Sequence, residues 1–72
     1  MVFEKERTAN NLRAIRNLRG KTQEQLAKES GVSLQSLKGY EQAENIMSLD
    51  AASRLSHALD CSIDSLVNEL SI

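Results

Sequence analysis

The side chains with the clearest chemical use lie between Ser33 and Gly39, where hydrogen-bonding and apolar side chains occur together. The Gln35 amide can donate and accept together, which matches N6 and N7 of adenine. Lys38 can reach guanine acceptors or a phosphate, and Leu34 can contact a thymine methyl group. Gly39 has no side chain, so it either lets a helix approach a DNA groove closely or is simply tolerated within the helix. The residues assigned to base reading, against the alternative of a solvated helix face, are Ser33, Leu34, Gln35, Lys38 and Gly39.

Two short helices are expected to hold these side chains outward. Residues 22–41 read TQEQLAKESGVSLQSLKGYE. Thr22 can cap the first helix, and Gln25 can complete a capping box. Gly31 can adopt a positive φ and end that helix, and Ser33 can cap the second. This order is typical of a helix-turn-helix, whose second helix can enter the major groove.

The apolar spacing along the whole chain predicts five helices and no strands. They are expected over residues 4–18, 23–29 and 34–42, after a cap at Ser48, and after a cap at Ser62. The side chains expected to face inward are Leu12, Ile15, Leu18, Leu26, Ala27, Leu37, Tyr40, Leu49, Ala52, Leu55, Leu59, Ile63, Leu66 and Val67.

These segments together resemble the phage-repressor type of helix-turn-helix domain, the lambda-repressor-like or Xre-type family. The resembling segments are residues 12–16, 20–23, 22–41, 48–50, 55–59 and 62–67, so the resemblance covers about residues 10–68. It implies an all-α, compact five-helix domain in which the second and third helices form the helix-turn-helix. The 72 residues are expected to form one domain.

The resemblance also implies roles for residues outside the reading helix. In this family a glutamine at the position of Gln23 commonly hydrogen-bonds a phosphate, and free N–H groups at a helix N-terminus favour such a contact. Arg16 is expected to pair with Glu41 and to lie near a phosphate. Besides Gln23, the residues expected to contact the DNA backbone are Arg13, Arg16, Arg19 and Lys21.

Charge is divided unevenly along the chain, whose net charge is −1. Residues 1–40 hold eight lysines and arginines against four acidic residues, a net of +4. Residues 41–72 hold one arginine against six acidic residues, a net of −5. The basic half contains the reading helix, and phosphate attraction depends on the local patch more than on the total. Glu44, in the loop after that helix, is expected to repel phosphate.

Several other classes of protein do not fit the sequence. His57 and Cys61 lie four residues apart, but a structural zinc site needs four ligands, so no metal or cofactor is expected. No serine has a base and an acid at suggestive spacing, and an enzyme is not expected. Cys61 has no partner for a disulfide, and no long apolar run suggests a membrane span. A cytoplasmic, nucleoid-associated location is expected.

Two functions remain open. The leading hypothesis is a sequence-specific transcriptional regulator, a repressor, that binds double-stranded DNA as a homodimer. The fourth and fifth helices and the C-terminal tail would form the dimer. The candidate contacts, which alternatively belong to the core, are Ile63, Val67, Leu70 and Ile72. The other hypothesis is a protein-interaction module of the same fold, such as an antirepressor or an antitoxin-like partner, with weak or no DNA binding.

Overall fold

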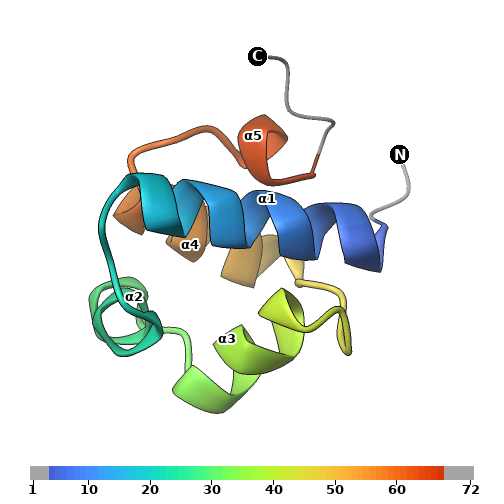
Figure 1. Ribbon diagram of the computed structural model, residues 1–72, viewed down its shortest axis with the longest axis horizontal. Coiled ribbons are helices and arrows are strands. Elements are labelled where there is room, and N and C mark those ends of the chain that lie inside the picture. The colour runs from blue at the N-terminus through green and yellow to red at the C-terminus, as the bar shows by residue number, and fades with distance from the viewer. Residues whose placement is uncertain (1–3, 68–72) are drawn as a thin grey trace.

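The computed structural model describes residues 4–67, and within them it contains five α-helices and no strand (Figure 1). The helices are α1 (Lys5–Leu18), α2 (Gln23–Ser30), α3 (Leu34–Glu41), α4 (Leu49–Ala58) and α5 (Ile63–Val67). The prediction of an all-α, five-helix fold is confirmed. The expected dimer contacts Leu70 and Ile72 lie outside the described residues.

The helix starts follow the local signals in the sequence. The Thr22 hydroxyl accepts the Gln25 N–H at 3.0 Å, and the Gln25 side chain accepts the Thr22 N–H at 2.8 Å, which completes the expected capping box. The hydroxyls of Ser33, Ser48 and Ser62 each accept the N–H three residues further on, at 3.1, 3.0 and 3.2 Å. These bonds satisfy N–H groups that have no partner inside the helix.

Three helices end in the same motif, with one residue in the left-handed region. These residues are Gly20 after α1, Ala43 after α3 and Asp60 after α4, with φ of 68°, 60° and 53°. In each case the next residue donates its N–H to the carbonyl five residues back, at 3.2, 2.9 and 2.9 Å. Only glycine adopts this conformation without a steric cost. The backbone at Ala43 is therefore strained.

The helices pack around one aliphatic core. α1 contacts α3 and α5 on opposite sides, while α2 packs against α3 and α4, and α4 packs against α5 (Figure 1). The Asn11 side chain donates to the carbonyl of Leu66 at 3.1 Å, which ties α1 to α5 through a buried hydrogen bond. The fully buried leucines are Leu12, Leu26, Leu37, Leu55, Leu59 and Leu66. Val67 is also buried, so it belongs to the core and is not available for a dimer contact.

Two of the expected inward-facing leucines point to solvent instead. Leu18 is 76% exposed and Leu49 is 67% exposed. An α-helix turns by about 100° per residue, so Leu18 lies about 120° around α1 from Leu12. The expected i, i+3, i+6 stripe therefore drifts off the buried face. In α4 the buried face is formed by Ala51, Ala52, Leu55 and Ser56, and Leu49 lies to one side of it.

Candidate nucleic-acid interface

The exposed side of α3 carries a stripe of long polar side chains. Gln35 and Lys38 are exposed, and so is Gln42, which caps the C-terminus of the helix. Their spacing of three and four residues places all three on one side of the helix. Gln42 was not among the residues assigned to base reading, although this spacing alone would have placed it on the stripe. At the other end, exposed Ser33 caps α3 and its hydroxyl donates to the Ser36 hydroxyl at 2.9 Å.

Gly39 does not belong to this exposed stripe, so the expectation that it lies on the outer face is wrong. The glycine is buried because the loop after α3 folds back over the last helical turn. The N–H groups of Glu44 and Asn45 both point at the Gly39 carbonyl, at 2.9 and 3.4 Å. A Cβ atom at Gly39 would lie 2.6 Å from the side-chain nitrogen of Asn45. Asn45 is exposed, so the end of its side chain would have to shift to admit a side chain at position 39.

Leu34 is also less exposed than expected. It is partly buried and packs against the hydrophobic core from the first turn of α3. Only part of its side chain is therefore left for a contact outside the protein.

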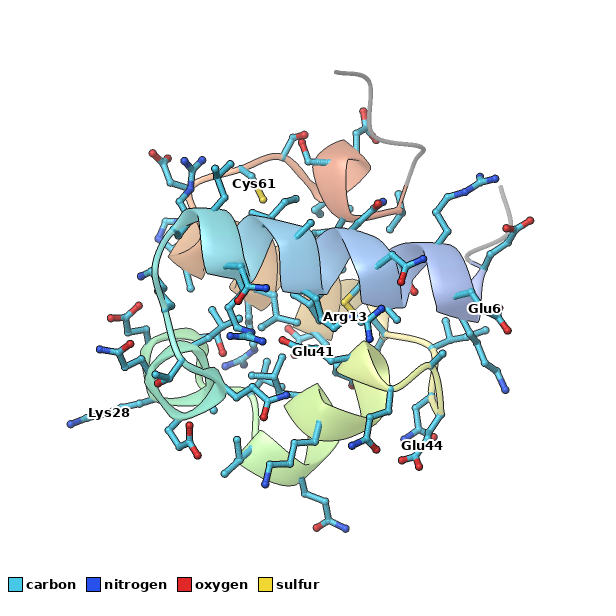
Figure 2. The ribbon with its side chains drawn as sticks, in the orientation of Figure 1. Glu6, Arg13, Lys28, Glu41, Glu44 and Cys61 are labelled. Carbon is cyan, nitrogen blue, oxygen red and sulfur yellow. The ribbon has the colours of Figure 1, made fainter. Side chains whose placement is uncertain are left out.

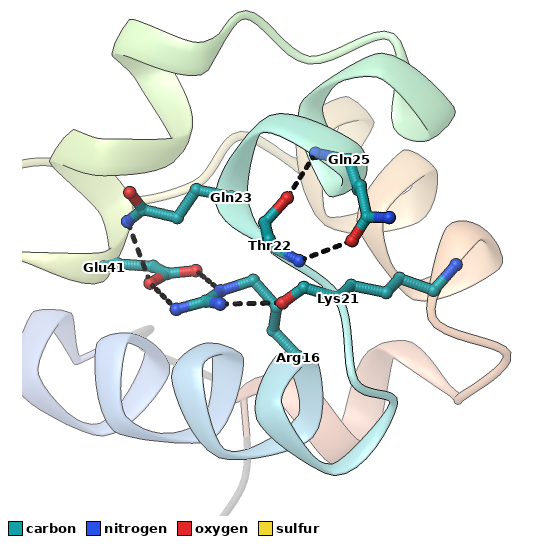
Figure 3. A network of polar contacts seen from close by, with 6 residues as sticks. All are labelled: Arg16, Lys21, Thr22, Gln23, Gln25 and Glu41. Carbon is teal, nitrogen blue, oxygen red and sulfur yellow. Dashed lines mark hydrogen bonds and ion pairs between the residues drawn. The ribbon is translucent and has the colours of Figure 1, made fainter.

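Glu41 is the centre of a buried polar network at the end of α3 (Figure 3). Its carboxylate lies 2.6 Å from Nε and 3.0 Å from Nη2 of Arg16, the residue that the family resemblance pairs with it. Arg16 also donates to the carbonyl of Lys21 at 2.8 Å. The Gln23 amide nitrogen donates to the same carboxylate at 3.1 Å. One carboxylate thus connects α1, the turn after it, the start of α2 and the end of α3.

The network is shielded from solvent, since Glu41 is 2% exposed and the Arg16 side chain is 14% exposed. The hydrogen bonds that Arg16 donates to Glu41 raise the pKa of Arg16 above its ordinary value, although burial alone would lower it. Removal of either partner would leave a buried charge uncompensated, which is costly. The pair therefore fixes the orientation of α3 relative to α1.

Arg19 and Lys21, both expected to contact phosphate, have partners inside the protein. Arg19 donates to the carbonyls of Leu59 and Asp60, at 2.7 and 3.1 Å. These carbonyls end α4, where helical partners are absent and the helix dipole favours a cation. Lys21 forms an ion pair with Glu29, and its side chain runs away from Gln23 and Glu41 (Figure 3). Neither cation lies free beside Gln23.

The remaining cations differ in where they point. Arg13 is exposed and donates to Asn10 of the same helix, and Figure 2 shows it on the side of α1 that faces α3. Lys28 extends from α2 away from α3 (Figure 2). Lys38 forms no ion pair with any residue in the described range 4–67. Arg13 therefore faces α3 and Lys38 lies on α3 itself, whereas Lys28 points away from that helix.

His57 and Cys61 do not form a site together. His57 is exposed, while Cys61 is partly buried and packs against the core. Burial raises the pKa of the Cys61 thiol, Arg19 opposes this shift, and Asp60 adds to it. Across residues 4–67, no group of three or more histidine, cysteine and acidic side chains could hold a metal ion. In the same range no helix is both long enough and apolar enough to cross a bilayer.

The capped α2, the left-handed glycine and the outward stripe of α3 define a helix-turn-helix domain. The chain belongs to the helix-turn-helix family HTH_3, whose model matches residues 12–66. The resemblance drawn from the sequence is thus confirmed.

Individual relatives give the same result. Over 62 residues the chain is 44% identical to RstR, the cryptic phage CTXphi transcriptional repressor of Vibrio cholerae serotype O1. The match covers 86% of this chain and 52% of RstR, so the chain spans about half the length of that relative.

Solved structures share the fold. The restriction-modification controller protein C.AhdI from Aeromonas hydrophila superposes with a TM-score of 0.82 and 31% identity, covering 86% of this chain and 94% of C.AhdI. The clp gene regulator ClgR from Corynebacterium glutamicum superposes with a TM-score of 0.82 and 28% identity, covering 90% of this chain and 69% of ClgR. Both are similar to this chain over nearly all of its length.

Proposed function

We propose that the protein is a DNA-binding transcriptional regulator, a repressor, that reads the major groove with the exposed side of α3. The observation that carries this proposal is the stripe of Gln35, Lys38 and Gln42 on a helix whose opposite side is fixed in the core. Amide and ammonium groups on such a stripe match the donor and acceptor pattern of base edges. Support also comes from RstR and ClgR, which are described as a repressor and a gene regulator.

Individual side chains have separate roles in this proposal. Gln35 reads a base pair, Lys38 reaches a guanine or a phosphate, and the exposed part of Leu34 contacts a thymine methyl group. The Ser33 hydroxyl caps α3, and the hydrogen-bonding capacity that remains to it contacts the DNA. Gln23 contacts a phosphate from the start of α2, where the helix dipole favours an anion. Arg13 and Arg16 support backbone binding from α1.

The proposed complex contains two copies of the chain in the cytosol, associated with the nucleoid. One reading helix covers a few base pairs, and two half-sites about one helical turn apart provide useful specificity. With Val67 in the core, α4 and the exposed part of Ile63 are the candidate contacts that remain in the described region.

The test separates base reading from backbone binding. Duplexes bound by the protein are selected from random DNA, and the affinities of Gln35→Ala and Gln23→Ala are measured on selected and random duplexes. Gln35→Ala should lose about 1–3 kcal/mol on the selected site and relax one base-pair preference. Gln23→Ala should weaken both duplexes by a similar factor, because phosphate contacts carry no sequence information. Equal losses on both duplexes for Gln35→Ala would remove it from the reading set.

Glu44 favours a second candidate function. It is exposed in the loop beside α3, where Figure 2 shows it at the edge of the helix, and a carboxylate there repels phosphate. A protein-interaction module, such as an antirepressor or antitoxin-like partner, would tolerate this charge. Retention on heparin or duplex DNA at low salt separates the two functions. A folded protein with no salt-sensitive retention supports the interaction module.

A further inference from the structure

We infer that Glu41 is a positioning residue for DNA binding, because it holds the Gln23 amide in the orientation that can donate to a phosphate. This inference rests on the proposed function and goes beyond the Arg16–Glu41 pair, which by itself joins α1 to α3. Glu41 is buried and does not touch DNA in this account. It would act on DNA binding through Gln23, whose amide nitrogen donates to the Glu41 carboxylate (Figure 3).

The Glu41 carboxylate cannot turn away from Gln23. Glu41 is 2% exposed, and both of its oxygens accept a hydrogen bond from the Arg16 guanidinium, at 2.6 and 3.0 Å. A planar guanidinium that binds a carboxylate in this forked way fixes its direction as well as its charge. The acceptor for Gln23 is therefore rigid before any DNA arrives.

The rigid Glu41 carboxylate selects one side of the Gln23 amide. An ionised carboxylate can only accept, so Gln23 must turn its nitrogen, and not its oxygen, toward Glu41. That nitrogen carries two hydrogens, and the bond to Glu41 at 3.1 Å uses one of them. A phosphate is also a pure acceptor, so the second N–H is the group that it can use. A freely rotating amide would present its oxygen to the phosphate part of the time.

A Gln23 amide that is already held in place should bind a phosphate more strongly than a free one. Fixing the side chain before binding removes the entropic cost of ordering it in the complex. Gln23 is already partly buried and held at the first position of α2. Its phosphate contact should therefore be strong when the network is intact and weak when the network is removed.

A double-mutant cycle tests this dependence directly. Gln23→Ala is introduced into the parent protein and into an Arg16→Met/Glu41→Met background, in which both charges are removed together. Affinity is measured on one duplex selected by the parent protein. Gln23→Ala should weaken binding about tenfold in the parent, as expected for a hydrogen bond to a charged group. In the Arg16→Met/Glu41→Met background, Gln23→Ala should lower the affinity by less than about twofold.

If Glu41 has only a structural role, the double-mutant cycle should give a different result. The uncharged background would then bind more weakly as a whole, but Gln23→Ala would lower affinity by the same factor in both backgrounds. That result would overturn the inference while leaving the proposed function intact. A parent protein that binds no duplex would instead overturn the proposed function, and this inference with it.

A second variant keeps the test decisive if the uncharged background does not fold, as judged by far-UV circular dichroism. Gln23→Asn retains the amide and both charges but shortens the reach to Glu41 by one methylene group. It should lose as much affinity as Gln23→Ala, because the amide is no longer held. If Gln23→Asn keeps the full affinity of the parent, an amide at this position does not need Glu41 and the inference fails.

Discussion

Arg16 and Arg19 show how one type of side chain acquires different tasks one helical turn apart. Arg16 turns toward α3 and compensates the buried charge of Glu41, whereas Arg19 turns toward α4 and covers the carbonyls at its end. Both guanidinium groups therefore have hydrogen-bond partners within the protein. The helix α1 therefore supports both the reading helix and the helix that lies behind it.

Arg19→Ala should destabilise the protein without changing how strongly salt weakens DNA binding. We expect a loss of about 1–2 kcal/mol, because two carbonyl contacts and a favourable interaction with the α4 dipole disappear. Urea denaturation measures the loss, and a salt titration of DNA binding measures the slope. Arg13→Ala is the control, since Arg13 is exposed, donates to Asn10 of its own helix, and should affect stability little. A reduced salt slope for Arg19→Ala would contradict the structural assignment.

Ala43→Gly should stabilise the protein. Ala43 has a φ of 60°, and the left-handed region costs a non-glycine residue about 1–2 kcal/mol. Part of this gain is offset because glycine makes the unfolded chain more flexible, so we expect a net gain of about 0.5–1 kcal/mol.

Thermal unfolding measures this gain, and Gly20→Ala is the reciprocal control. Gly20 has a φ of 68° and no atom within 4 Å of an added Cβ, so its replacement tests the backbone cost alone. We expect Gly20→Ala to lower stability by about 1 kcal/mol. A neutral result for both variants would mean that these helix ends are not strained.

The helix-turn-helix depends on how α3 is anchored, because its two sides have opposite requirements. Leu37 is fully buried on the inner side, while Gln35 and Lys38 stay exposed on the outer side. The loop after α3 folds over Gly39 at the end of the helix. The Arg16–Glu41 pair joins α3 to α1. α3 is therefore presented as a rigid element.

Leu37→Ala should be severely destabilising. Deletion of a fully buried leucine side chain costs about 2–5 kcal/mol through lost burial and a residual cavity. A small domain has little stability to spare, so this change should unfold much of the population. Leu18→Ala is the matched control, because Leu18 is 76% exposed and should change stability by less than about 0.5 kcal/mol. Similar melting temperatures for the two variants would contradict the placement of α3.

The molecule as a whole is acidic, so DNA binding must depend on how its charges are arranged. The net charge is −1, but four cations in the described region are held in ion pairs, at Arg7, Arg16, Lys21 and Arg54. Lys38 and Lys28 are both exposed, yet only Lys38 lies on α3. Position in the fold therefore matters more than the number of cations.

Lys38→Ala and Lys28→Ala should differ in how strongly salt weakens their binding to DNA. Each phosphate neutralised by a cation contributes about one unit to the slope of log affinity against log salt concentration. Lys38→Ala should reduce the slope by about one unit per protomer if the lysine contacts a phosphate. Lys28→Ala removes the same charge from a helix face that points away from α3, and it should leave the slope unchanged (Figure 2). Equal slopes for the two variants would place DNA elsewhere on the surface.

The sequence by itself determined the elements of this protein and much of the exposed stripe on α3. The bounds of α1, α2 and α3 lie within one residue of the ranges expected from periodicity and caps. The capping box at Thr22 and the turn at Gly31 were predicted because they depend on residues a few positions apart. Exposure of Gln35 and Lys38 followed from the same helical spacing.

Only the tertiary structure decided which partners the polar side chains meet. Arg19 contacts carbonyls that lie 40 and 41 residues away, and Gln23 contacts Glu41 18 residues away. Burial of Gly39 and exposure of Leu18 likewise depend on where a loop or a neighbouring helix passes. Local propensity fixes where helices begin and end, but these contacts arise from how the helices cross, because a long side chain binds whichever partner the packed neighbour brings within reach.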